Sequence, residues 1–176
     1  MKTKVITGKV RFSYANVWEP KSINGSDPKY SVSLIISKKD KITVEKVKKA
    51  IEVAKKEGKS KFQGEGSGIL KMPLKDGDLE KIGDETYENS YFINANSNTK
   101  PGIVDRNVNP IIQQNDFYSG CYGRASIVFY PYNENGNKGI ACGLQNLQKT
   151  DDGEILTGHS RPEDDFEVIE GEDFLS

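Results

Sequence analysis

The stretch DFYSGCYGRASIVFYPYNENGNKGIACGLQNLQKT, Asp116–Thr150, carries the clearest fold signal in the chain. Its two arms alternate apolar and polar residues, which is the period of a half-buried β-strand. Between the arms lies NENGN, and an Asn-Gly pair at the centre of such a segment favours a tight turn between antiparallel strands. The stretch therefore predicts a hairpin of two long strands.

The alternation divides the first arm into two faces. One face is apolar and consists of Ala125, Ile127 and Phe129. The other combines rings, a guanidinium and a hydroxyl, and it consists of Tyr122, Arg124, Ser126, Val128 and Tyr130. Rings can stack on bases and cations can bind phosphates, so this face is typical of a platform for single-stranded nucleic acid. It also fits tyrosines that only cover the outside of a barrel, because tyrosine is common in strands.

Upstream of the hairpin, the sequence predicts further strands and one helix. Residues 3–18 are interpreted as a strand pair or one long bent strand, and residues 30–37 and 91–97 as single strands. Between them, apolar residues recur at helical spacing, with Thr43 expected as the N-cap and Gly58 as the stop. The lysines on the opposite helix face are interpreted as solvated.

Strand-rich chains of this length with one inserted helix favour a small closed barrel. Gly120, Gly123 and Gly143 lie inside strand patterns, where they would ease tight barrel corners. The segment after Pro162 has no periodicity and is interpreted as disordered. We therefore expect an all-β (mainly β) body at residues 1–152 and a flexible acidic tail at residues 153–176.

Charge divides the chain in the same way. Residues 1–150 contain 24 basic and 16 acidic residues, whereas the remainder contains one basic and ten. This asymmetry indicates a polyanionic partner and an intramolecular competitor for it, or a tail that only improves solubility. The sequence shows no signal peptide and no apolar run that could span a membrane, so we expect a soluble protein of the cytoplasm.

The residue types that support catalysis or metal binding are sparse. The only cysteines are Cys121 and Cys142, and the only histidine is His159, so no zinc site, cofactor or other metal is expected. The hairpin register places Cys142 opposite Val128, which favours two buried reduced thiols over a disulfide. No nucleophile elbow is present and His159 lies at the edge of the tail, so the chain is not expected to be an enzyme.

Four segments occur in a telling order: GKVRFSYANVWEPK, KYSVSLIISKKD before a helix, GCYGRASIVFYPYNENGNKGIACGLQNLQK, and an acidic tail that ends near phenylalanine. Together they resemble the single-stranded DNA-binding proteins of phages and prophages, the group related to the T7-type replication protein. The resemblance implies an OB-fold, a five-stranded Greek-key barrel capped by one α-helix. It also implies sequence-independent binding of single-stranded DNA in replication or recombination, inside the bacterial host cell.

The resemblance also implies an acidic, disordered C-terminal tail that competes with DNA and contacts phage or host partners such as a polymerase, primase or helicase. Here the tail reads RPEDDFEVIEGEDFLS, Arg161–Ser176, and its last phenylalanine is followed by Leu175 and Ser176. Carboxylates would imitate phosphates and phenylalanines would imitate stacked bases. The residues expected to act in this way are Glu163, Asp164, Asp165, Phe166, Glu172, Asp173 and Phe174.

Candidate DNA contacts follow from residue type and strand position. For base stacking we expect Phe12, Trp18, Tyr122 and Tyr130, although Phe12 also lies on a face that fits the core. For phosphate binding we expect Lys9, Arg11, Lys100, Arg106 and Arg124.

Three alternatives remain open. The barrel could be a protein-binding module of a phage whose tail is a linear motif. It could be a metal-dependent nuclease of phage recombination, or a DNA-binding protein that also anneals strands. An exposed edge strand could also pair two copies into a homodimer.

Overall fold

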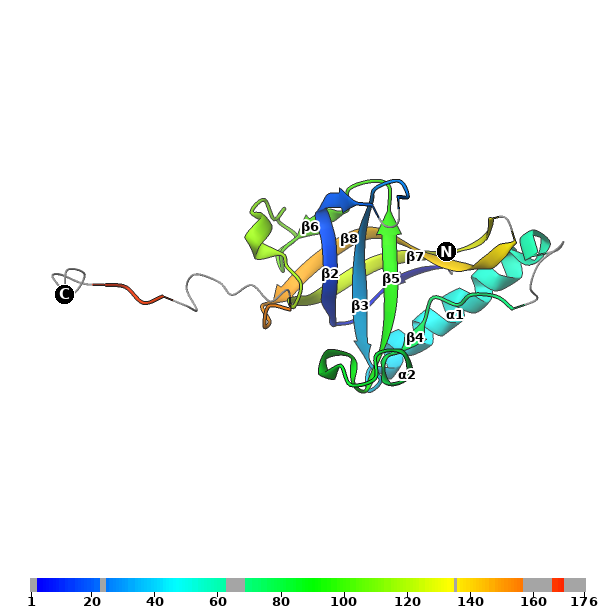
Figure 1. The fold of residues 1–176 in the computed structure, drawn as a ribbon, viewed down its shortest axis with the longest axis horizontal. Coiled ribbons are helices and arrows are strands. Elements are labelled where there is room, and N and C mark those ends of the chain that lie inside the picture. The colour runs from blue at the N-terminus through cyan, green and yellow to red at the C-terminus, as the bar shows by residue number, and fades with distance from the viewer. Residues whose placement is uncertain (1–2, 23–24, 63–68, 135, 157–165, 170–176) are drawn as a thin grey trace.

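In a computed structural model, the described residues are 3–22, 25–62, 69–134, 136–156 and 166–169 (Figure 1). The strands are β1 (Lys4–Ile6), β2 (Val10–Lys21), β3 (Lys29–Ser37), β4 (Lys75–Asp76), β5 (Ser90–Ser97), β6 (Gly102–Val104), β7 (Tyr122–Glu134) and β8 (Asn137–Asp151). The helices are α1 (Lys41–Glu57), α2 (Gly77–Glu80) and the short 3-10 turns η1 (Lys59–Phe62), η2 (Glu85–Tyr87) and η3 (Gln114–Asp116).

Five strands close into a ring in the order β7-β2-β3-β5-β8, with β8 returning to β7. All neighbours in the ring are antiparallel except β5 and β8, which are joined in parallel through one pair, Asn96 and Gly143. The strand β1 extends the free edge of β7, and β6 lies along β8. The molecule is therefore mainly β, with one major helix.

The hairpin expected between residues 116 and 150 is the longest element of the ring. β7 and β8 pair from Tyr122 to Asp151, and the chain turns between Glu134 and Asn137. Ala125, Ile127 and Phe129 point into the core, as the alternation predicts. The register shifts the sequence-based pairing by one residue, so that Cys142 lies opposite Phe129 rather than Val128.

Both cysteines are free and buried, in agreement with the sequence-based expectation. Burial raises the pKa of Cys121 to about 11, because a thiolate is poorly solvated in the core. The same cause raises the pKa of Cys142.

The helix α1 covers one end of the ring and contacts β1, β7 and β8 (Figure 1). Its N-cap is Asp40, whose carboxylate accepts a hydrogen bond from the Thr43 N–H at 3.1 Å, so the expected cap at Thr43 is wrong. Thr43 is instead buried, and its hydroxyl accepts a hydrogen bond from the Gly8 N–H at 2.9 Å. The helix begins at Lys41, so Thr43 lies inside its first turn, and its hydroxyl ties the helix to the chain before β2.

The core fills the interior of the ring with the inward-facing residues of its strands and the apolar face of α1. Phe12 is 0% exposed, and its ring lies 4.9 Å from the ring of Phe117. β2 also runs to Lys21, beyond the expected end at Trp18. Among the described residues, no helix is both long and apolar enough to cross a membrane.

Candidate nucleic-acid interface

Three neighbouring cavities lie on the outer face of the ring. Two of them, of about 420 and 340 Å³, share Lys29, Asn96 and Tyr130, and we call their combined lining the central groove. A third cavity of about 360 Å³ shares Lys29, Asn94 and Asn96 with the second one, and we call it the side pocket. The three cavities therefore form one continuous surface over β3, β5, β7 and β8.

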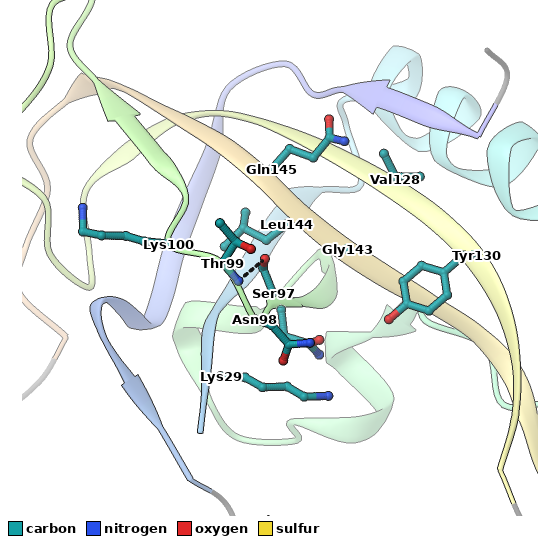
Figure 2. Close-up of a pocket in the computed structure, with 11 residues that line it drawn as sticks. Lys29, Ser97, Asn98, Thr99, Lys100, Val128, Tyr130, Gly143, Leu144 and Gln145 are labelled. Atoms are coloured by element: carbon teal, nitrogen blue, oxygen red, sulfur yellow. Dashed lines mark hydrogen bonds between the residues drawn. The ribbon is translucent and has the colours of Figure 1, made fainter. Parts of the chain in front are cut away.

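The central groove opens where β5 and β8 separate on either side of the Asn96–Gly143 pair. The ring of Tyr130 lies above Gly143, where a Cβ would stand 3.5 Å from Tyr130 Cε1. In Figure 2, Tyr130 and Lys100 lie at opposite ends of the larger cavity, with Ser97 and Asn98 between them. The groove therefore places a ring at one end and a cation at the other.

Positive charge dominates this surface. The groove is lined by one acid, Glu134, and by four lysines, Lys29, Lys71, Lys75 and Lys100. None of the ion pairs between described residues involves any of these lysines. Their charges are therefore available to an anionic ligand such as a phosphate backbone.

Rings and amides fill the space between the lysines. Tyr130 is 43% exposed and Tyr132 is half-buried beside it. Burial raises the pKa of Tyr130, so its hydroxyl stays neutral at physiological pH. A neutral ring can stack on a base without repelling the phosphates nearby, while Asn94 and Asn96 supply both donors and acceptors.

Two of the residues expected from the sequence, Tyr130 and Lys100, line this groove. Trp18 lies at its margin, with Lys100 Nζ 4.8 Å from the centre of the Trp18 ring. The Trp18 indole donates a hydrogen bond to the carbonyl of Phe117 at 3.0 Å, which fixes the ring. Phe12 is buried in the core, so its ring is not available for stacking.

The other expected residues gather around the end of β8, far from the groove. Tyr122 and Tyr130 are eight residues apart on β7, about 26 Å at the rise of an extended strand. Lys9 Nζ and Arg11 Cζ lie 5.2 and 5.3 Å from the centre of the Tyr122 ring. We call this second set the basic end patch; it consists of Lys9, Arg11, Arg106, Tyr122 and Arg124.

Two of the four cations in the basic end patch, Lys9 and Arg11, already have partners. Lys9 forms an ion pair with Asp151 at 2.9 Å, and this contact lowers the pKa of Asp151. Arg11 donates hydrogen bonds to the carbonyls of Gly120 and Glu154 at 3.1 and 2.9 Å. Gln148, opposite Arg124 in the β7–β8 register, donates to the carbonyl of Arg106 at 3.3 Å. Lys9 and Arg11 of the patch are therefore engaged in contacts within the protein, whereas the groove lysines form no ion pair between described residues.

Sequence reasoning missed most of the groove lysines. Lys71 and Lys75 lie in a stretch without periodicity, and Lys71 reaches the groove through backbone hydrogen bonds to Lys138 and Ile140 of β8. Such long-range pairing leaves no local signal. Lys29 could have been found, because it is the first residue of a strand with clear alternation.

In the tail, Phe166 is described and is 76% exposed. The remaining expected tail residues, Glu163, Asp164, Asp165, Glu172, Asp173 and Phe174, lie outside the described residues. No group of three histidine, cysteine or acidic residues that could hold a metal ion occurs in the described part of the chain.

A mainly β ring of five strands with a lysine-lined groove is the arrangement of OB-like proteins, a class with many binders of single-stranded nucleic acid. The family model described as "Enterobacter phage Enc34, ssDNA-binding protein" matches residues 3–175, and the chain belongs to this family. The resemblance to phage single-stranded DNA-binding proteins is thereby confirmed. The family is one of DNA-binding proteins and not of enzymes.

Similar solved structures support the fold. The single-stranded DNA-binding protein from bacteriophage Enc34 in complex with ssDNA matches with a TM-score of 0.77 and 23% identity, over 88% of this chain and 89% of that one. The gp2.5 protein, a single-stranded DNA-binding protein encoded by bacteriophage T7, matches with a TM-score of 0.62 and 14% identity, over 90% and 97% of the two chains. Protein p50 of Acyrthosiphon pisum secondary endosymbiont phage 1 is 29% identical over 98% of this chain and 99% of that protein.

Proposed function

We propose that the protein binds single-stranded DNA in the central groove, without sequence preference, during replication or recombination of a phage in its host cell. The observation that carries this proposal is the groove itself, which is lined by four lysines and by the rings of Tyr130 and Tyr132. The lysines, Lys29, Lys71, Lys75 and Lys100, have no ion-pair partner among the described residues. Lysines bind phosphates of any sequence, and every base has a face that can stack. The groove therefore favours affinity without base selection.

The finer architecture belongs to the same proposal. We infer that the ring is the Greek-key barrel of an OB-fold with α1 as its cap, and that residues 153–176 form an acidic tail. The first residues of this segment are attached to the body. The Leu156 N–H donates a hydrogen bond to the carbonyl of Ser119, and Arg11 donates one to the carbonyl of Glu154. The tail would then begin at the basic end patch.

In this proposal the tail competes with DNA for the cations of the body. Arg161–Ser176 contains seven acids and one arginine. Each exposed ion pair is worth only a fraction of a kcal/mol, but a tether raises the local concentration of several pairs at once. DNA binding would release the tail to recruit a polymerase, primase or helicase. A second copy could pair along the open edge of β1.

The experiment that tests the groove is a fluorescence titration with an oligo-dT. Trp18 is the only tryptophan of the chain and lies beside Lys100, so its quenching reports on the groove. The titration is run at several salt concentrations on the full chain and on the double variant Lys29→Ala/Lys71→Ala. A matched control, Lys55→Ala/Lys56→Ala, removes the same charge from the exposed side of α1.

The groove variant should bind more weakly and lose about 1.4 from the slope of log K against log salt, since single strands give about 0.7 per phosphate contact. The α1 variant should retain most of the wild-type slope. Absence of salt-sensitive quenching in the wild type, or equal losses in both variants, would contradict the proposal.

A further inference from the structure

The side pocket differs in character from the central groove beside it. Its lining contains three aromatic residues, Tyr14, Tyr87 and Phe92, whereas the groove offers mainly lysines and amides. It opens onto the groove, because Asn94 and Asn96 line both. A strand that follows the groove would therefore pass the mouth of this pocket.

The three rings are gathered around one cation. The rings of Tyr87 and Phe92 meet edge to face, with their centres 5.1 Å apart. Lys81 Nζ lies 5.6, 5.4 and 5.7 Å from the centres of the Tyr14, Tyr87 and Phe92 rings. Tyr87 and Phe92 are almost fully buried, so the exposed Tyr14 ring offers the face on which a flat heterocycle can stack. A long lysine side chain can move aside to meet a phosphate.

Two hydroxyl groups of this pocket lack hydrogen-bond partners. Ser33 and Tyr87 are each only 2% exposed, and within the described part of the chain nothing hydrogen-bonds to Ser33 Oγ or Tyr87 Oη. Buried hydroxyls are nearly always paired, because an unpaired one costs free energy. Both residues line the same cavity, so one ligand with a hydrogen-bonding edge could satisfy both.

A strained backbone conformation at Tyr14 places a third ring, its own, at the pocket. Tyr14 has a φ of 47°, in the left-handed region that a bulky residue rarely adopts. It lies where the β2–β3 register shifts between Ser13 and Asn16, and such a bulge redirects a side chain. The Asn16 amide holds the bend through a 3.2 Å hydrogen bond to the Tyr14 carbonyl. Tyr14 is 63% exposed and lines the pocket.

A nucleobase has both properties that the pocket demands, a flat face that can stack on the exposed ring of Tyr14 and a polar edge for the two hydroxyls. We propose that the side pocket takes up one unstacked base of the strand bound in the central groove, with its edge hydrogen-bonded to Ser33 and Tyr87. This inference rests on the proposed function and adds to it one nucleotide position that is fixed by its base. A hydroxyl both donates and accepts, so the pocket requires a base without requiring a particular one.

The test uses the full chain and a dT oligomer of about the size of one site, within the range of about 4–16 nucleotides for an OB-fold. A single abasic residue is placed at each position in turn. Wild-type affinity should fall about five- to a hundredfold at one position and less elsewhere, as expected for loss of one stacked base. The variant Tyr87→Phe keeps the ring against Phe92 and removes only the hydroxyl.

Tyr87→Phe should weaken binding of the intact oligomer about three- to tenfold, the range expected for one hydrogen bond, and leave binding of the critical abasic oligomer unchanged. Tyr91→Phe is the matched control, since Tyr91 lies on β5 next to Phe92 in the sequence and outside the pocket. Thermal unfolding of free Tyr87→Phe should match the wild type, because no protein contact is lost.

If no abasic position stands out, or if Tyr87→Phe weakens the intact and abasic oligomers equally, the base pocket is wrong while groove binding survives. If Ser33→Ala also leaves the loss of affinity at the critical abasic position unchanged, the two hydroxyls do not bind the base. Failure of the wild type to bind any oligomer would overturn the pocket and the proposed function together.

Discussion

At the scale of single residues, Tyr130 shows how a ring is presented on the outer face of the ring of strands. It lies beside Gly143 of β8, where an added Cβ would make an ordinary contact with it at 3.5 Å. Partial burial raises the pKa of its hydroxyl, while 43% of the residue stays exposed at the groove. Tyr122, on the same strand, is held by Lys9 and Arg11. The two tyrosines are therefore unequal as stacking sites.

We predict that Tyr130→Ala weakens binding of a short dT oligomer by about 1–3 kcal/mol, the cost of losing one stacked base. Tyr122→Ala should have a smaller effect on the same oligomer, because this ring lies at the far end of β7. Fluorescence anisotropy with a labelled oligomer measures both. A larger loss of affinity for Tyr122→Ala than for Tyr130→Ala would indicate that bases stack at the basic end patch rather than in the groove.

At the scale of elements, the hairpin of β7 and β8 determines the shape of the ring through its glycines. Gly120 and Gly123 are packed against backbone: a Cβ would stand 1.9 Å from the carbonyl oxygen of Glu154 and of Gln148, respectively. Gly120 also has a φ of +118°, which disfavours a side chain. Gly143 has only ordinary contacts around it. The three glycines that the sequence groups together therefore have different roles.

Gly123→Ala should destabilise the protein by about 1–3 kcal/mol or more, since β7 must move away from β8 to accommodate the methyl group. Gly143→Ala should change the free energy of unfolding by less than about 0.5 kcal/mol. Urea unfolding followed by circular dichroism measures both. Equal stability of the two variants would show that the hairpin can relax at Gly123.

A cluster of charges joins the end of β3 to β4 and α2. Lys38 Nζ lies 2.7 Å from Asp76 and 2.8 Å from Asp78, and these hydrogen bonds raise the pKa of Lys38. The hydrogen bond from Lys38, with a second from the Asn89 N–H, lowers the pKa of Asp78 below its ordinary 3.8. The folded state therefore binds the Asp78 proton less tightly than the unfolded state does.

The lowered pKa of Asp78 predicts a loss of stability in acid. Its contribution is present above about pH 4 and is lost as the pH falls through the lower folded pKa. The melting temperature of the wild type should therefore fall more steeply below pH 4 than that of Asp78→Asn, whose side chain does not titrate. Glu85→Gln, at an exposed position outside the cluster, is the control. Parallel curves for the wild type and Asp78→Asn would contradict the prediction.

At the scale of the whole molecule, charge and fold divide the chain at nearly the same point. The ring ends with β8 at Asp151, and most acids of the C-terminal segment follow it. β8 ends on the side of the ring away from α1 (Figure 1). The acidic segment therefore starts next to the basic end patch, where Arg11 donates a hydrogen bond to the carbonyl of Glu154. In the proposed competition with DNA, the tail would meet this patch before the groove.

We predict that a chain ending at Arg161 binds oligo-dT about tenfold more tightly than the full chain at low salt. The difference should fade as salt rises, because exposed charges are screened. A full-length chain with the tail acids changed to their amides separates charge from length and should behave like the truncated chain. Equal affinities of all three proteins at low salt would leave the tail without a competitive role.

Sequence reasoning predicted well the elements in which the pattern of apolar and polar residues follows directly from which side of the strand is buried. Alternation gave the faces of β7, because a strand in a closed ring has one buried and one exposed side. The same alternation on β2 places Phe12 on the core side, and of its two interpretations the core one is correct. Lys71 could not be predicted as a groove residue, since hydrogen bonds to β8 place it there. The side pocket depends on a bulge at Tyr14 that alternation does not reveal.

The burial of both thiols has a practical consequence for following this protein in solution. A maleimide reacts with an accessible thiolate, and neither Cys121 nor Cys142 offers one near neutral pH. The natural chain therefore needs no cysteine removal before dye attachment. Asn98→Cys, on the exposed rim of the groove, would carry the single reactive thiol. A fluorophore there would record the arrival and departure of individual DNA strands in real time.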